Sequence, residues 1–132
     1  MNDSAQQNAC TASNGTSVDL SDAQLARYSR HILLDAVDLA GQARLLASHM
    51  LVVGCGGLGS SVIPYLAASG VGRLTLIDAD TIELSNLQRQ VSYRTADVGQ
   101  SKSAVMAKWV NQLNPEVQVR GVNTRVGEEE LV

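Results

Sequence analysis

The sequence of 132 residues contains only two cysteines, Cys10 and Cys55, which stand far apart in unlike surroundings. A disulfide framework, or a metal site built on paired Cys-x-x-Cys knuckles, needs more cysteines at closer spacing, so both are excluded. We therefore expect a reduced, cytoplasmic setting.

A clustered basic surface is also missing. The formal net charge is -3, whereas binding to the phosphates of a nucleic acid or to an anionic membrane requires many basic side chains on one surface. No apolar run approaches the roughly 20 residues that span a bilayer. We therefore expect no nucleic-acid partner and no membrane partner, and any phosphate site must be local.

Residues 1–18 lack the basic start and the apolar run of about 7 to 15 residues that a secretory signal needs. Their composition, rich in Ser, Asn and Gln, predicts a disordered tail. The length and apolar content of residues 19–132 suit a single domain with a modest core.

After this tail, the apolar spacing predicts helices before a sheet. Ser21 and Gln24 form a capping-box pattern that opens a helix over residues 22–33, with Leu25, Tyr28 and Ile32 on its apolar face. A shorter helix is expected over residues 41–47.

From residue 50 the pattern alternates strand and helix. The aliphatic run over 50–54 predicts a strand buried on both faces of a parallel sheet. A helix over 58–69, bent at Pro64, ends at a left-handed Gly70. A second strand over 73–80 completes a strand, glycine turn, helix and strand.

The remaining segments continue this alternation. A polar loop over 81–99 is long enough to suspect a function. A helix over 101–113, with Val105, Trp109 and Leu113 as its buried stripe, precedes a strand over 116–126 and the start of another helix over 127–132. The predicted fold is α/β, a Rossmann-like parallel sheet with N-terminal helices, incomplete at its C-terminus.

The glycine turn is the first candidate site. Gly54, Gly56 and Gly59 fit G-x-G-x-x-G, and Gly57 is a fourth glycine in the same turn. Glycines permit a tight turn and let backbone amides approach phosphate oxygens at a helix start. A single match is weak, because such turns also occur as plain connections. No Lys follows the last glycine, which excludes a P-loop.

The acids after the second predicted strand are the next candidates. Asp78 stands where a carboxylate can accept hydrogen bonds from ribose hydroxyls, while Asp80 is expected to cap or turn the loop more than to bind a ligand. An NAD-dependent dehydrogenase and an ATP-using enzyme fit the glycine turn and these acids equally well.

The polar loop favours ATP over NAD. A triphosphate brings several negative charges that cationic groups must balance. Asn86, Arg89 and Lys102 follow Asp78, and Lys102 opens a predicted helix. Each alone would be an ordinary surface residue. Because ligands of such sheets bind beyond the carboxyl ends of the strands, together they predict a phosphate site.

Several ordered motifs carry a family resemblance: "RYSRHILL", "GQARL", "VVGCGGLGS", "GVGRLTLIDAD", "SNLQRQ", "VGQSK" and "LNP". Over residues 20–126 the sequence resembles the MoeB, ThiF and HesA adenylyltransferases, bacterial relatives of ubiquitin-activating enzymes, with the MoeB-like branch as the best match. The region from 19 to 132 would then be the N-terminal half of a ThiF-type nucleotide-binding domain.

The resemblance implies ATP- and Mg²⁺-dependent adenylation of the C-terminal glycine of a ubiquitin-like sulfur carrier ending in Gly-Gly, by a homodimer. It implies catalytic roles for Arg89, Lys102 and Arg30, the last supplied across the dimer interface. The nucleotide-binding set that we predict is Gly54, Gly56, Gly57, Gly59, Asp78, Asp80, Ser85, Asn86, Leu87, Gln88, Arg89 and Lys102. Neither cysteine has to act, because the carrier's own carboxylate attacks, and His31 and His49 are expected to be packing or surface residues.

The sequence departs from the family's pattern in its length. The family implies a further half with an aspartate for Mg²⁺ and ATP, a loop that grips the carrier and Cys-x-x-Cys pairs for a structural zinc, and nothing here matches these. We favour a truncated adenylyltransferase. A half-enzyme completed by a partner chain and a non-catalytic nucleotide-binding or dimerisation module are the alternatives. An uncovered sheet edge and face would make the chain associate when expressed alone.

Overall fold

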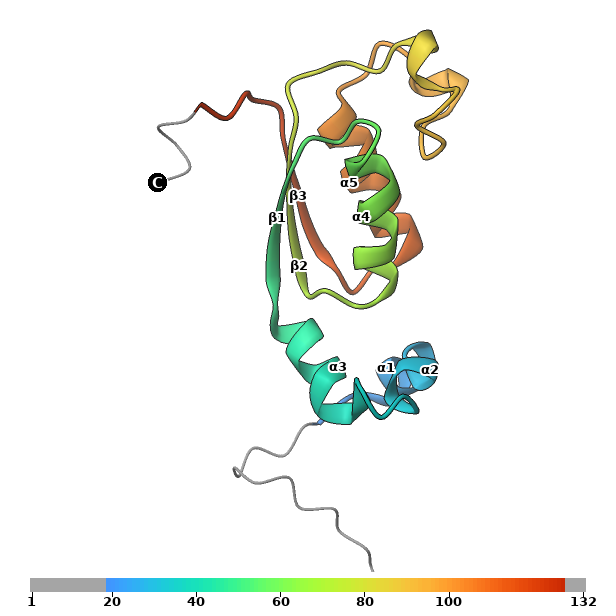
Figure 1. Cartoon of the computed structure of the whole chain (residues 1–132), viewed down its shortest axis with the longest axis vertical. Coiled ribbons are helices and arrows are strands. Elements are labelled where there is room, and N and C mark those ends of the chain that lie inside the picture. Colours follow the sequence, from blue (N-terminus) through green and yellow to red (C-terminus); the bar gives the residue numbers. More distant parts are fainter. Residues whose placement is uncertain (1–18, 128–132) are drawn as a thin grey trace, which may run out of the picture.

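The computed structural model describes residues 19–127, so the tail expected over 1–18 and nearly all of the helix expected over 127–132 lie outside it. Three short helices precede the sheet (Figure 1): α1 (Asp22–Arg27), α2 (Ser29–Ile32) and α3 (Asp38–Ala47). Within the described range no helix is long and apolar enough to cross a membrane.

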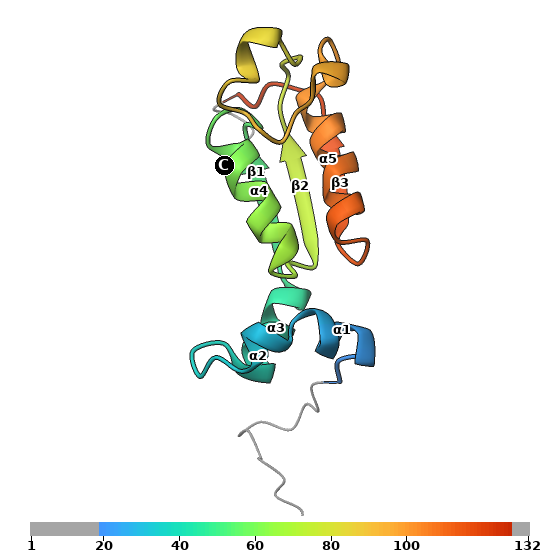
Figure 2. The ribbon, with the colours of Figure 1, turned by 90° about the vertical axis from the view of Figure 1, so that its right-hand side faces the viewer.

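The sheet is parallel and has the strand order β1 (His49–Val53), β2 (Arg73–Ile77) and β3 (Gln118–Val122). The strands are in register, so that Val53, Ile77 and Val122 lie side by side at their carboxyl ends. The connecting helices α4 (Gly59–Ala68) and α5 (Lys102–Leu113) lie on the same side of the sheet (Figures 1 and 2), as right-handed crossovers require. The α/β, Rossmann-like prediction is confirmed.

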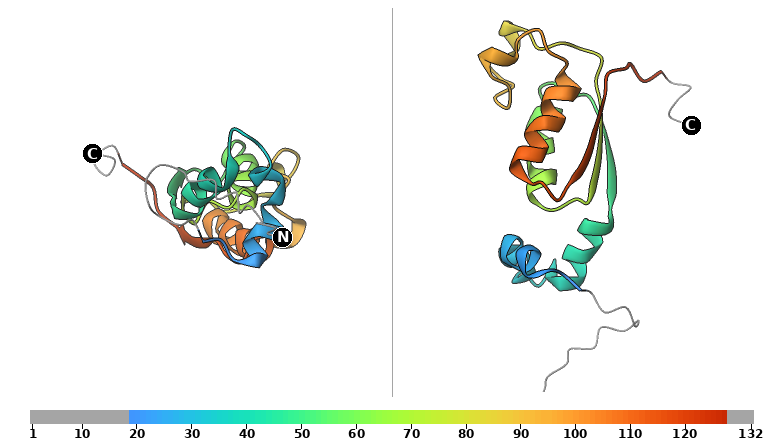
Figure 3. Two further views of the ribbon diagram at one scale, coloured as in Figure 1. Left: turned by 90° about the horizontal axis from the view of Figure 1, so that it is seen from below. Right: turned by 180° about the vertical axis from the view of Figure 1, so that it is seen from behind.

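The core lies between this helical layer and one face of the sheet. Leu74 and Leu76 of β2 are buried against Ile63 of α4 and Met106 of α5. The prediction that β1 is buried on both faces is wrong, because Leu51 remains 53% exposed. Seen from behind, no helix of the described part of the chain lies over the other face (Figure 3). The aliphatic residues of β1 therefore face solvent on alternate positions.

The single helix predicted over 22–33 is also wrong, because the chain breaks at Tyr28 between α1 and α2. The capping box of Ser21 and Gln24 is confirmed. Tyr28 is buried, and its hydroxyl accepts a hydrogen bond from Nδ2 of Asn114 at 2.8 Å. This long-range contact overrides the local helical pattern, and Leu25 is left 38% exposed.

Other boundaries need smaller corrections. Helix α3 begins at Asp38, before the predicted start. The buried residues of α5 are Lys102, Ser103, Met106 and Val110, and not the predicted stripe, of which Leu113 is exposed. The left-handed stop after α4 is confirmed by Gly70, with φ of 87°.

The polar loop leaves β2 and returns to α5 at the carboxyl end of the sheet, opposite α1, α2 and α3 (Figures 1 and 2). It contains two 3-10 turns, η1 (Leu84–Asn86) and η2 (Thr95–Asp97). A β-bridge between Thr81 and Ser101 closes its base. The loop is thus held over the glycine turn that follows β1.

Candidate functional site

The glycine turn between β1 and α4 has the geometry of an anion-binding turn. Gly54 has φ of 94°, a left-handed conformation, and its amide donates to the carbonyl of Ile77 at 2.8 Å. A Cβ on Gly59 would collide with the carbonyl oxygen of Gly54, so only glycine lets α4 start this close to the strand. Gly57 has open space around it.

The backbone amides of Gly56, Gly57 and Leu58 donate to no acceptor within residues 19–127. They precede the first turn of α4, where the helix dipole favours negative charge. The turn therefore offers free donors to a phosphate group.

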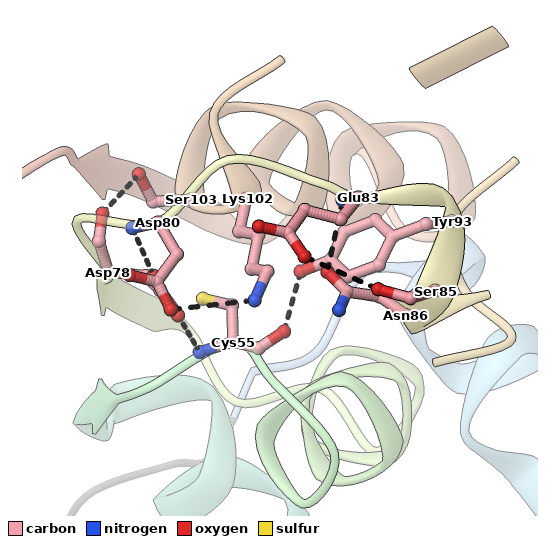
Figure 4. A network of polar contacts seen from close by, with 9 residues as sticks. All are labelled: Cys55, Asp78, Asp80, Glu83, Ser85, Asn86, Tyr93, Lys102 and Ser103. Atoms are coloured by element: carbon pink, nitrogen blue, oxygen red, sulfur yellow. Dashed lines mark hydrogen bonds and ion pairs between the residues drawn. The ribbon is translucent and has the colours of Figure 1, made fainter. Parts of the chain in front are cut away.

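Asp78 ties the end of β2 to this turn. Its Oδ2 accepts from the amide of Cys55 at 2.6 Å, and its Oδ1 accepts from the amide of Asp80 at 2.7 Å (Figure 4). Each carboxylate oxygen has a further lone pair, so Asp78 can fix the turn and still accept a hydrogen bond from a ribose hydroxyl.

A polar cavity of about 470 Å³ lies near the turn, although neither the glycines of the turn nor Asp78 line it. The link is Gln90, a lining residue whose Nε2 is 3.8 Å from the point that a Cβ on Gly56 would occupy. The cavity brings together four of the predicted residues, Asp80, Asn86, Arg89 and Lys102, from the loop and the start of α5. The remaining lining residues are Ala79, Thr81, Glu83 and Gln90. The cavity is thus a polar, charged site at the carboxyl end of the sheet, where such folds bind ligands.

Lys102 is the buried cation of this cavity. It is the first residue of α5, after the N-cap Ser101, and its side chain is 8% exposed. Its ammonium lies 3.6 Å from a carboxylate oxygen of Asp80, which is itself 61% exposed. Figure 4 shows the side chain directed between the acids after β2 and the turn at Asn86. An ammonium has three donors, so Lys102 can keep Asp80 and bind a phosphate as well.

Asn86 and Arg89 supply further donors from η1 and the turn after it. Oδ1 of Asn86 accepts from the amide of Glu83 at 3.1 Å, which orients the amide and leaves Nδ2 for a ligand. Nη1 of Arg89 donates to the carbonyl of Ser85 at 3.1 Å. The other guanidinium nitrogens of this exposed side chain remain for an anion.

Several predicted residues lie away from the cavity. The hydroxyl of Ser85 donates to Oε2 of Glu83 at 3.3 Å, Leu87 is half-buried against the core, and Gln88 is exposed. None of the three lines the cavity. Arg30 is an exposed residue of α2, and α2 lies at the opposite end of the molecule from the loop (Figures 1 and 2).

The sequence reasoning missed the residues that hold the loop in place. The hydroxyl of Tyr93 donates to the carbonyl of Cys55 at 2.6 Å, and the hydroxyl of Ser92 donates to the carbonyl of Ser60 at 2.8 Å. The sequence did offer one signal for Tyr93, because an aromatic residue within an otherwise polar loop indicates a side chain that packs against the core. Gln90 does not hold the loop, but its buried side chain lines the cavity. It was also missed, since it lies outside every apolar pattern.

Burial controls the ionisation of the groups below the cavity. It raises the pKa of the Cys55 thiol to about 12, with a further rise from the charge of Asp78 and an opposing effect of Lys102. Burial also raises the pKa of Tyr93. Cys55 is therefore a neutral packing residue near pH 7, unlike the low-pKa thiols that act as nucleophiles.

Within residues 19–127 no group of three or more His, Cys, Asp or Glu side chains gathers to hold a metal ion. Two acidic residues, Asp80 and Glu83, nevertheless line the cavity. Mg²⁺ prefers oxygen ligands and is often held by one or two carboxylates together with substrate phosphates. The cavity thus fits Mg²⁺ only together with a phosphate ligand.

Curated relatives share most of the described chain. The SAMP-activating enzyme E1 of Haloferax volcanii is 54% identical over 103 residues, which cover 78% of this chain and 38% of the relative. The molybdopterin-synthase adenylyltransferase of Haemophilus influenzae is 46% identical over 114 residues, which cover 86% of this chain and 47% of the relative. The chain thus spans less than half the length of these relatives.

The fold is also similar to part of an enzyme that has been solved with a bound nucleotide. The tRNA N6-threonylcarbamoyladenosine dehydratase TcdA of Escherichia coli, in complex with AMP, superimposes with a TM-score of 0.76 at 35% identity over 87% of this chain and 46% of that one. The same enzyme has been solved with ATP. The model of the ThiF family matches residues 28–132. The chain therefore belongs to the ThiF family.

Proposed function

We propose that this chain is the nucleotide-binding part of an ATP-dependent adenylyltransferase that activates the C-terminal glycine of a ubiquitin-like sulfur carrier, as in molybdopterin or thiamine pathways. One observation carries the proposal. Three residues line a single cavity near a glycine turn with free amides: the buried Lys102 and Asn86 and the exposed Arg89. The named relatives include a molybdopterin-synthase adenylyltransferase and a complex with ATP.

The proposed reaction needs positioning and charge neutralisation more than a protein nucleophile. A carboxylate oxygen of the carrier attacks the α-phosphorus and forms a P–O bond. The bond from the α-phosphorus to the bridging oxygen breaks, and its electron pair leaves with pyrophosphate. Lys102 and Arg89 neutralise charge that grows on the phosphates, while the free amides before α4 hold the phosphate nearest the turn.

Asp78 binds the ribose in this proposal, and the glycines Gly54, Gly56, Gly57 and Gly59 form the floor beneath the nucleotide. When bound, Mg²⁺ would neutralise part of the triphosphate charge, with Asp80 and Glu83 as the oxygen ligands available in the cavity. The structural zinc of the family is not part of the proposal.

Arg30 cannot serve the cavity of its own chain, because α2 lies at the other end of the molecule (Figure 1). Its exposure leaves it available to a second copy. We therefore include a homodimer in the proposal, with Arg30 of one subunit directed at the triphosphate of the other.

Calorimetric titration of the unchanged chain with ATP plus Mg²⁺ and with NAD tests the ligand. ATP should bind and NAD should bind more weakly or not at all. A clear preference for NAD would favour a dinucleotide-binding domain and contradict the proposal. Carrier-dependent exchange of pyrophosphate into ATP should be absent or very weak, since the sequence matches neither the aspartate nor the carrier-gripping loop that the family resemblance implies.

Replacing Lys102 or Arg89 with Ala tests the site itself. Each substitution removes a charge-assisted hydrogen bond, so ATP binding should weaken by about 1.5 to 3 kcal/mol. Lys108→Ala is the matched control, because Lys108 is an exposed cation on the same helix and does not line the cavity. Unchanged ATP affinity in both site variants would remove these residues from the proposal.

A further inference from the structure

Gln90 has a buried side chain whose acceptor lacks a partner. The residue is 3% exposed. Its Oε1 makes no hydrogen bond within residues 19–127. A buried polar atom without a partner costs free energy, and such atoms in native structures call for an explanation.

The position of Gln90 places this amide between two anion-binding elements. It lines the cavity that contains Arg89 and Lys102. On its other side, Nε2 lies 3.8 Å from the point that a Cβ on Gly56 would occupy. Gly56 belongs to the turn with free amides.

We propose that Gln90 is a positioning residue for the phosphate end of a bound nucleotide, an inference that rests on the proposed function. Its side-chain amide donates a hydrogen bond to a phosphate oxygen. The phosphate group would then be held on one side by the amides of the glycine turn and on the other by Arg89 and Lys102. Nε2 is the donor in this bond, because a phosphate oxygen accepts hydrogen bonds and cannot pair with Oε1. A neutral donor at this point binds phosphate without adding another charge that must be buried.

The backbone around Gln90 is already fixed. Its amide donates to the carbonyl of Asn86 at 3.0 Å, and its carbonyl accepts from the amide of Tyr93 at 3.1 Å. The tyrosine in turn holds the carbonyl of Cys55. The loop is thus held independently of the Gln90 side chain, which is free to serve a ligand.

Calorimetry with ATP, ADP, AMP and adenosine, each with Mg²⁺, tests this role in the 132-residue chain. Gln90→Leu should weaken ATP binding about tenfold and leave adenosine binding unchanged, because the lost hydrogen bond is to phosphate. Gln90→Glu should weaken ATP binding further than Gln90→Leu, since its carboxylate repels the phosphates. Gln112→Leu, on the exposed side of α5, should bind ATP like the unchanged chain.

Thermal unfolding of the ligand-free chain separates a ligand role from a structural one. Gln90→Leu removes an unpaired buried acceptor, so its unfolding midpoint should stay equal or rise. A lower midpoint with equal loss of affinity for all four ligands would assign Gln90 a structural role and overturn the inference.

The same titrations separate failure of this inference from failure of the proposed function. If the unchanged chain binds ATP and Gln90→Leu binds it equally well, only the role of Gln90 is overturned. If the unchanged chain binds none of the four ligands, the proposed nucleotide site itself is overturned.

Discussion

Tyr93 joins the polar loop to the glycine turn through a buried hydrogen bond to the carbonyl of Cys55. Tyr93→Phe keeps the ring and leaves that carbonyl without its donor. We expect the free energy of unfolding to fall by about 1 to 3 kcal/mol, as for other buried groups left unpaired. Urea denaturation measures the change. Tyr65→Phe is the control, because Tyr65 is 78% exposed, and equal stability of both variants would contradict this role of Tyr93.

The thiol of Cys55 makes stability depend on pH in the alkaline range. Burial raises its pKa from the ordinary value of 9.0 to about 12 in the folded chain. The folded state therefore favours the protonated thiol. The contribution of the protonated thiol to the free energy of unfolding is fully present below about pH 9 and is lost as the pH rises toward about 12.

Urea denaturation of the unchanged chain and of Cys55→Ala, between pH 8 and pH 11, tests this linkage. Stability of the unchanged chain should fall faster with pH above 9, by up to about 1.4 kcal/mol per pH unit relative to the variant. Tyr28, whose pKa burial also raises, contributes to both proteins alike. The pKa of Tyr93 is raised mainly by burial, which the two proteins share, and further by the charge of Cys55, so the part that depends on Cys55 belongs to the same linkage. Parallel curves would contradict the assignment to Cys55.

At the level of elements, two glycines of one turn serve different purposes. A Cβ at Gly59 would press on the carbonyl of Gly54, whereas one at Gly57 would meet open space. Gly59→Ala should therefore destabilise the chain by about 1 to 3 kcal/mol, as overpacking does. Gly57→Ala should leave stability nearly unchanged and weaken ATP binding, because the methyl group protrudes where we place the nucleotide.

Thermal unfolding measures the stability of the two glycine variants, and calorimetric titration measures their affinity for ATP. Equal destabilisation by the two substitutions would mean that the turn is uniformly packed. Full ATP affinity in Gly57→Ala would place the nucleotide away from Gly57.

The elements that the sequence predicted correctly are those with a local cause. The capping box at Ser21, the stop at Gly70 and the strand predicted over 73–80, which the structure shortens to 73–77, depend on nearby residues. The break at Tyr28 could not be predicted, since it follows from a contact with Asn114 far along the chain. The burial of α5 is displaced onto Met106 and Val110 because helix α4 and strand β3 pack on that side.

The residues of the candidate site also divide into those that the sequence predicted and those that depend on tertiary structure. Lys102, Asn86 and Arg89 were predicted from charge and position after β2, and the fold brings them to one cavity. Gln90 and Tyr93 were missed, because the loop's tertiary path decides which of its polar residues are buried. Ser85, Leu87 and Gln88 belong to the same motif but do not line the cavity.

At the scale of the whole molecule, no helix of residues 19–127 covers the second face of the sheet (Figure 3). At the carboxyl ends of the strands this face carries an apolar row of Val53, Ile77 and Val122. Val53 is 54% exposed, and Leu51 lies next to it on the same face. Toward the amino ends the row of His49, Arg73 and Gln118 is polar. The apolar area is therefore concentrated at the end of the sheet that holds the candidate site.

An open apolar face beside an unpaired strand edge favours association between chains. We expect the weight-average mass of the chain to rise with concentration in sedimentation equilibrium. The double variant Leu51→Gln and Val53→Thr should lower this rise, because it makes the open face polar without entering the core. Leu84→Gln is the matched control, since Leu84 is 67% exposed but lies in the loop. Association that persists in the double variant and disappears in Leu84→Gln would place the contact on the loop.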